Sequence, residues 1–139
     1  MTVASAPRTR VAVIDDERDV LTFLRLALED EGFEVLASST PTSVLPELQA
    51  FAPHLICLDL LMPERGGLSL FVEIRRLPAL RFVPVIILSG LAGASRPLDG
   101  LDLDDDVVPP AAYLEKPVDL AGLLAIVRRL VAAEAEAMR

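Results

Sequence analysis

A short, fully apolar run that ends on a carboxylate constrains the fold of this chain more than any other feature. The run is LICL at 55–58, Asp59 follows it, and the loop beyond carries Pro63 and the pair Gly66-Gly67. Four apolar residues bounded by turn residues indicate a strand buried on both faces, as in a parallel sheet. Asp59 is therefore expected at the carboxyl end of a buried strand, the edge of an open α/β sheet where ligands bind.

Strand-like runs alternate with helix-like segments along the chain. Apolar runs predict strands at 11–14, 33–37, 55–58, 83–88 and 111–114. Apolar residues at helical spacing predict helices over 17–31, 41–50, 67–77 and from 120 onward, with caps at Asp16, Gly32, Thr40 and Asp119. Pro46 lies inside the second of these helices and predicts a kink or a late start. The strand–helix alternation predicts a parallel sheet with helices on both faces.

One segment breaks this alternation. Residues 91–110, LAGASRPLDGLDLDDDVVPP, stand where a fourth helix belongs, between the fourth and fifth strands. Glycine, proline and clustered aspartate all lower helix propensity. We therefore predict an irregular or shortened fourth helix there.

The composition bounds the chain to one acidic domain. Its 139 residues fit a single domain, which we place at 10–132, between a flexible lead at 1–9 and a helix end or linker start at 133–139. The net charge of −8 argues against a nucleic-acid or anionic-membrane surface. The single cysteine, Cys57, predicts a buried thiol and a reducing, cytoplasmic compartment. The first ten residues lack the apolar core of a signal peptide, and no uncharged stretch is long enough for a membrane span.

Charged residues follow three of the predicted strands. Asp15 and Asp16 follow the first, Asp59 the third and Lys116 the fifth. Because the carboxyl ends of parallel strands meet at one edge of the sheet, these side chains are expected to lie together. Clustered carboxylates repel one another unless a cation compensates them, and hard oxygen ligands suit Mg²⁺. Three carboxylates, one Mg²⁺ and one lysine sum to zero charge, which would let a phosphoryl group approach, and a carboxylate can act as a nucleophile toward phosphorus.

Four stretches together resemble one known family. They are VAVIDDE at 11–17, LICLDLLMPERGG at 55–67, VIILSG at 85–90 and YLEKP at 113–117. In this order and at strand ends they are similar to the receiver domain of bacterial two-component response regulators (CheY-like), over about residues 10–132. The resemblance implies a flavodoxin-like (βα)5 fold, a doubly wound parallel sheet of order 2-1-3-4-5.

The resemblance also implies roles for the acidic residues. Asp59 would be the phosphoacceptor, modified by a histidine kinase. Asp16 would ligate Mg²⁺ directly, Asp15 mainly through water, and the backbone carbonyl of Leu61 would complete the protein ligands, together with Asp59.

The remaining motif residues would respond to the phosphoryl group. Ser89 would donate a hydrogen bond to one phosphoryl oxygen and Lys116 would pair with another, with a cis peptide between Lys116 and Pro117. Tyr113 would be the switch aromatic that turns inward when Ser89 moves, although a half-buried strand aromatic is the alternative for that position. His54 precedes the third strand, at the opposite end from Asp59, and is expected to be a solvated loop residue.

The expected function is a phosphoacceptor signalling domain, not an enzyme. Its partners would be a histidine kinase or histidine phosphotransfer protein and a downstream protein or output domain, with a homodimer as a further option. A phosphorelay intermediate or phosphate sink without its own output is an alternative. A metal-dependent phosphohydrolase is a weaker one, because that class usually has a second aspartate two residues after the nucleophile, where this chain has Leu61.

Two leucines bear on how long the phosphorylated form would last. In the family, the positions two after the acceptor and two after the hydroxyl residue flank the path of the hydrolytic water. Here these positions are Leu61 and Leu91, which cannot orient a water by hydrogen bonding. The resemblance therefore predicts slow loss of the phosphoryl group.

Overall fold

A five-stranded parallel sheet forms the centre of the computed structural model, which describes residues 8–40, 43–59, 67–89 and 107–137. The strand order is β2-β1-β3-β4-β5, as predicted. The strands are β1 (Arg10–Ile14), β2 (Glu34–Ser38), β3 (Leu55–Asp59), β4 (Val85–Ser89) and β5 (Ala112–Glu115). Each predicted strand is therefore present, and every boundary lies within two residues of the expected position.

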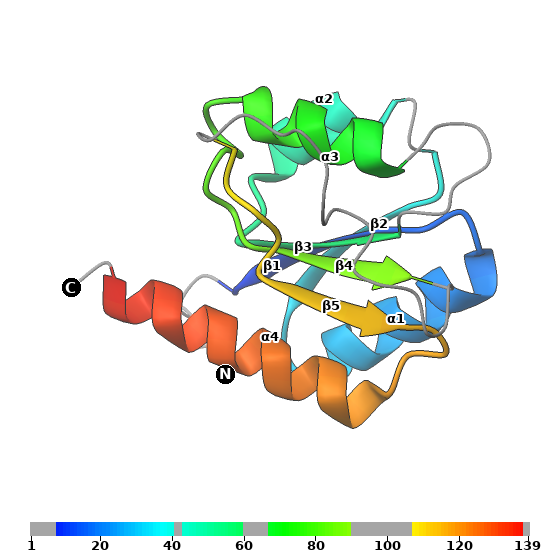
Figure 1. The fold of residues 1–139 in the computed structure, drawn as a ribbon. Helices are drawn as coiled ribbons and strands as arrows, with labels where there is room; N and C mark the ends of the chain where they lie inside the picture. The colour runs from blue at the N-terminus through cyan, green and yellow to red at the C-terminus, as the bar shows by residue number, and fades with distance from the viewer. Residues whose placement is uncertain (1–7, 41–42, 60–66, 90–106, 138–139) are drawn as a thin grey trace, which may run out of the picture.

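Helices cover both faces of the sheet, so the predicted doubly wound α/β architecture is confirmed (Figure 1). The described helices are α1 (Arg18–Asp30), α2 (Val44–Phe51), α3 (Gly67–Arg76) and α4 (Leu120–Ala137). In Figure 1, α2 and α3 lie on one face and α1 and α4 on the other. The helix labelled α4 follows β5. The irregular helix predicted at 91–110 falls largely on residues outside the described ranges, and residues 107–110 within them are not helical.

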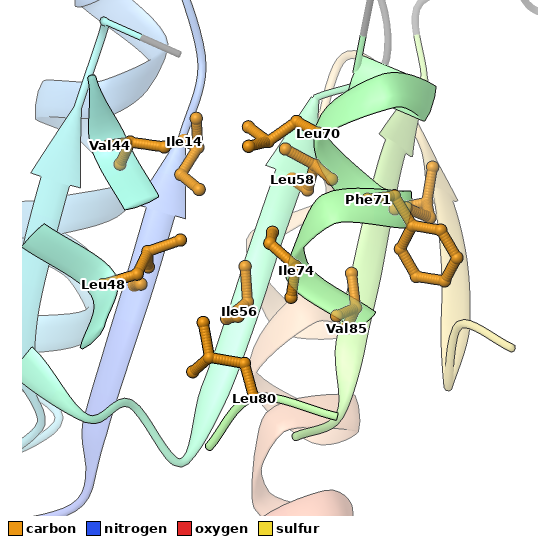
Figure 2. Close-up of a cluster of buried hydrophobic side chains, with 12 residues drawn as sticks. Ile14, Val44, Leu48, Ile56, Leu58, Leu70, Phe71, Ile74, Leu80 and Val85 are labelled. Carbon is orange, nitrogen blue, oxygen red and sulfur yellow. The ribbon is translucent and has the colours of Figure 1, made fainter. Parts of the chain in front are cut away.

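The protein has a hydrophobic core on each face of the sheet, because side chains alternate along the strands. Successive strand residues point to opposite faces of a sheet. Ala12, Ile14, Ile56 and Leu58 pack with residues of α2 and α3, among them Val44, Leu48, Leu70, Phe71 and Ile74 (Figure 2). Their sequence neighbours Val11, Val13, Leu55 and Cys57 pack on the other face with leucines of α1 and α4. Because both faces are covered, the central strands are apolar throughout, which is the pattern that made them visible in the sequence.

Local signals at the helix ends act largely as predicted. Gly32 adopts φ +95° directly after the C-cap of α1, a conformation that glycine tolerates best. Asp119 accepts a hydrogen bond at Oδ2 from the Gly122 amide at 3.3 Å and so caps α4. The N-cap of α1 is Glu17, one residue later than the predicted Asp16. α2 starts late, at Val44, so Pro46 falls in its first turn, where a missing amide hydrogen costs no helical hydrogen bond.

The thiol of Cys57 is buried and free, as predicted. Its burial in β3 raises the pKa of this thiol to about 12, so it remains protonated at neutral pH and is a poor nucleophile. Within the described ranges, every helix is too short or too polar to cross a membrane.

Candidate functional site

The register of the sheet brings the predicted site residues to one edge. Ile14 pairs with Leu58, so Asp15 and Asp59 follow side by side at the ends of β1 and β3. Asp59 pairs with Leu88, which places Ser89 one residue further along β4. Ser89 in turn pairs with Glu115, and the Lys116 amide donates to the Ser89 carbonyl at 2.7 Å. Backbone pairing thus gathers residues that are far apart in sequence.

Lys116 connects the carboxylates of this edge. Its Nζ lies 2.7 Å from Asp15 Oδ2, 2.9 Å from Glu17 Oε1 and 3.3 Å from Asp59 Oδ2. Asp15 and Asp59 are buried, whereas the side chain of Glu17 is 60% exposed. A single ammonium therefore holds two buried carboxylates and one surface carboxylate.

The protonation of Lys116 follows from these contacts. Burial alone lowers the pKa of the ammonium, because it penalises the charged form. Hydrogen bonds to Asp15 and Glu17, and the charges of Asp15 and Asp59, outweigh burial and raise that pKa above its ordinary value. The lysine is consequently a permanent cation at physiological pH.

The acidic side chains fit a divalent cation. Asp15, Asp16, Glu17 and Asp59 each offer a carboxylate oxygen, and these oxygens lie within 4.8 Å of one another. Asp15 and Asp59 are buried, and Lys116 Nζ lies 2.7 Å from Asp15 Oδ2 and 3.3 Å from Asp59 Oδ2. Clustered carboxylate oxygens, two of them on buried side chains, form the hard donor set that Mg²⁺ prefers. The chain's own residues therefore suit the predicted metal. Leu61, whose carbonyl was the fourth predicted ligand, lies outside the described residues.

Glu17 is the member that sequence reasoning missed as a site residue. It stands directly after the acidic pair, and its position suggested only the start of a helix. The Asp15 Oδ1 atom accepts a hydrogen bond from the Glu17 amide at 2.9 Å, and this turn directs the Glu17 side chain toward Lys116. The run of three consecutive acidic residues was the signal that could have identified it.

The predicted hydroxyl and aromatic residues lie on the other face of the same edge. Ser89 is buried at the end of β4. Tyr113 is half-buried and packs against the core cluster beneath α3. Successive residues of a strand point to opposite faces, so Tyr113 and Leu114 pack on opposite sides of the sheet. The Lys116–Pro117 peptide bond is cis, as the resemblance implied.

A groove of about 630 Å³ opens beside Lys116. Its lining is mainly apolar and includes three charged side chains, and it is formed by the start of α1 and the chain after β5. The lining residues are Glu17, Asp19, Val20, Phe23, Lys116, Pro117 and Val118. Phe23 is 48% exposed there, which is unusual for so large an apolar side chain.

His54 lies away from this edge and has a structural contact. Its Nδ1 accepts a hydrogen bond from the Arg10 amide at 2.9 Å, and its own amide donates to the Arg10 carbonyl at 2.8 Å. The imidazole is half-buried, so the expectation of a solvated loop residue was too simple.

Comparison with known proteins finds similarity to response regulators, both in a family model and in individual relatives. The family model described as the response regulator receiver domain matches residues 11–128. The KDP operon transcriptional regulatory protein KdpE of Escherichia coli (strain K12) is 35% identical over 120 residues, covering 86% of this chain and 50% of the relative. The transcriptional regulatory protein PrrA of Mycobacterium leprae (strain TN) is 35% identical over 130 residues, covering 94% and 52%. The chain thus spans about half the length of these curated relatives.

Solved structures agree with the overall fold. A CheY-like response regulator receiver domain protein from Methanospirillum hungatei JF-1 has a TM-score of 0.77 at 26% identity, covering 94% of this chain and 99% of that one. The chemotaxis protein CheY4 of Vibrio cholerae has a TM-score of 0.76 at 21% identity, covering 89% and 99%, a likeness that concerns the fold alone.

Proposed function

The chain belongs to the response regulator receiver domain family, and on that premise we propose that it accepts a phosphoryl group on Asp59 from a phosphohistidine donor. The observation that carries this proposal is the position of the Asp59 carboxylate. It is buried at the carboxyl end of β3, with Oδ2 3.3 Å from Lys116 Nζ and within a cluster of three other carboxylates. This is an environment built to hold a charged nucleophile and an incoming phosphate.

The proposed transfer is a single displacement at phosphorus. An oxygen of Asp59 forms the new P–O bond while the P–N bond of the donor breaks, and the electron pair of that bond returns to the imidazole nitrogen. Lys116 holds the carboxylate beforehand and then pairs with a phosphoryl oxygen. Ser89, at the end of β4, donates its hydroxyl to another oxygen.

Mg²⁺ would be held by Asp16 and Asp59, with Asp15 supporting through water and the Leu61 carbonyl completing the protein ligands. A bound Mg²⁺ would neutralise charge on the phosphoryl oxygens during transfer. Without a divalent cation, Lys116 is the compensating charge that the described residues place among Asp15, Glu17 and Asp59.

The groove beside Lys116 is the surface we assign to the phosphodonor, a histidine kinase or a histidine phosphotransfer protein. It borders the ammonium that faces Asp59, and its exposed Phe23 offers an apolar contact. Phosphorylation would then change what the domain binds, either an output domain or a separate protein, through Ser89 and Tyr113. We place this activity in the cytoplasm. A phosphorelay intermediate would use the same acceptor and the same groove.

Phosphorylation of the parent protein and of Asp59→Asn tests the proposal. With acetyl phosphate and Mg²⁺, the parent should gain a base-labile phosphate adduct by mass spectrometry, and Asp59→Asn should not. Asp30→Asn, which changes an exposed carboxylate at the end of α1, is the matched control and should be modified like the parent. Full modification of Asp59→Asn would contradict the assignment.

The groove is tested with a histidine donor. Phe23→Ser should slow transfer from a phosphorylated histidine phosphotransfer protein while leaving acetyl phosphate labelling unchanged. Leu26→Ser is the control, because Leu26 is similarly exposed on α1, at 55% against 48% for Phe23, and is not among the residues that line the groove. Equal effects of both variants would remove the groove from the proposal.

A further inference from the structure

Arg75 is a buried cation on α3 that is not part of the acidic cluster. It belongs to the last turns of α3 and is only 4% exposed, which is rare for arginine. Its guanidinium stacks over the Phe71 ring at 5.1 Å. Burial lowers the pKa of this guanidinium to about 10, so the charge is held at a cost that its contacts must offset.

The guanidinium joins two segments of the chain. Its Nη1 donates to the carbonyls of Leu80 at 3.2 Å and Val83 at 2.6 Å, both in the connection from α3 to β4. Its Nε donates at 2.8 Å to the carbonyl of Val108, in the chain that enters β5. The planar fork of an arginine holds five N–H donors in fixed directions on three nitrogen atoms, whereas the three donors of a lysine all lie on one nitrogen.

The contact with Val108 is well placed to control β5. Pro109 and Pro110 follow, and each fixes its own backbone φ near −65°. The next amide, of Ala111, donates to the Val85 carbonyl at 2.8 Å, and β5 then leads through Tyr113 to Lys116. A stiff connection transmits a displacement of Val108 into the strand instead of absorbing it.

β5 depends on such a contact because it is the shortest strand and lies at the edge of the sheet. It has four residues and, within the described part of the chain, pairs with β4 alone. Val107 and Tyr113 both pack against the core cluster that contains Phe71, so the stacking partner of Arg75 belongs to the same cluster. The structure therefore connects α3 to the strand that carries Lys116 and Tyr113.

We propose that Arg75 is a positioning residue, whose hydrogen bond to Val108 sets the placement of β5 and, through it, of Lys116 and Tyr113 beside the acceptor site. The claim that Arg75 places β5 is independent of the proposed function, whereas its consequence for phosphorylation rests on that function. Arg75 does not touch the reacting atoms. Its effect reaches the site through the backbone of β5.

Arg75→Met tests this inference, with Arg76→Met as the matched control. Methionine keeps a long apolar stem beside Phe71 but donates no hydrogen bond, and Arg76 is the exposed neighbour in the same helix turn. Amide exchange of Ala111 and Lys116 should become about tenfold faster in Arg75→Met, while exchange of Glu34 in β2, whose amide donates to the Thr9 carbonyl, should stay as in the control.

Tyr113 supplies an independent signal. It is the only tyrosine, and the chain has no tryptophan, so the intrinsic fluorescence reports on β5 alone. Arg75→Met should change this emission while the far-UV circular dichroism stays native, and Arg76→Met should change neither. Arg75→Lys should recover only part of the parent signal.

Two results would overturn the inference. One is uniform acceleration of exchange at Glu34 and in β5, which would make Arg75 a general stabilising residue. The other is failure of both Arg75→Met and Arg75→Gln to fold, which would assign Arg75 to the core. Neither result depends on phosphorylation. A parent protein that is not modified on Asp59 would contradict the proposed function and leave the exchange result standing.

Discussion

The three carboxylates around Lys116 allow distance and burial to be separated as determinants of ion-pair strength. Asp15, Glu17 and Asp59 lie 2.7, 2.9 and 3.3 Å from Nζ, so distance alone ranks Glu17 above Asp59. Their side chains are 0%, 60% and 2% exposed, so burial ranks Asp59 above Glu17. We expect burial to decide, because solvent screens an exposed pair at any distance.

The expected magnitudes follow from Coulomb's law. With an effective dielectric constant of about 20, a charge pair at 2.7 Å is worth at most about 6 kcal/mol and one at 3.3 Å about 5 kcal/mol. Desolvation of the ions removes a large part of these values. We therefore expect coupling free energies with Lys116 of about 3 kcal/mol for Asp15, about 2 kcal/mol for Asp59 and below about 1 kcal/mol for Glu17.

Double-mutant cycles measure these couplings. Lys116→Met is combined in turn with Asp15→Asn, Asp59→Asn and Glu17→Gln, and urea unfolding is followed by far-UV circular dichroism at neutral pH with a chelator present. Asparagine at position 15 keeps an acceptor for the Glu17 amide, so the cycle isolates the charge. Lys116→Met alone should destabilise the protein, and Asp59→Asn should partly restore it by relieving repulsion.

The ranking is the decisive result. A coupling for Glu17 equal to or larger than that for Asp59 would refute the reasoning, because it would show that distance outweighs burial at this site. Couplings below about 0.5 kcal/mol for all three would show that Lys116 does not compensate the buried carboxylates.

Three further outcomes are expected. The pKa of Lys116 is raised in the folded protein, so its ion pairs stabilise the fold fully below the ordinary lysine pKa of about 10.4. This stabilisation is lost as the pH rises above that value. The difference in unfolding free energy between the parent and Lys116→Met should therefore shrink when urea unfolding is repeated at alkaline pH. His54→Ala should lose about 1 kcal/mol of unfolding free energy because the Arg10 amide loses its acceptor, whereas His54→Asn, which keeps an acceptor at a similar position, should lose less; equal losses would show that the hydrogen bond is not responsible. Leu61→Asn and Leu91→Glu should speed loss of phosphate from the modified protein about tenfold or more, measured by mass spectrometry over time, and unchanged decay in both would contradict the shielding argument.

The sheet and the acidic cluster were predictable because each depends on where a strand ends. Val11–Ile14 and Leu55–Leu58 are fully apolar, so their limits are visible, and Asp15 and Asp59 follow directly. Parallel topology then requires the two ends to meet, whatever path the loops take. The pairing of Ile14 with Leu58 in the sheet shows that the two strand ends do meet.

Contacts made to backbone atoms were not predictable in this way. Arg75 binds carbonyls, which every residue carries, so nothing in the sequence marks Val108 as its partner. His54 likewise accepts from the Arg10 amide, 44 positions away. The position of such a partner depends on the path of the connecting chain, and periodicity carries no information about that path.

The position of Lys116 depends both on sheet topology, which the sequence predicts, and on contacts to backbone atoms, which it does not. Its place at the end of β5 follows from topology, and so does its approach to Asp15 and Asp59. The position of β5 along its own axis does not, because an edge strand is held by one neighbour and by the chain that enters it. Val108 is the described point at which that entering chain is bound to α3. If the Arg75 contact sets the position of β5, then Arg75 also governs the distance between Lys116 Nζ and Asp59 Oδ2. No sequence motif links Arg75 to these two residues.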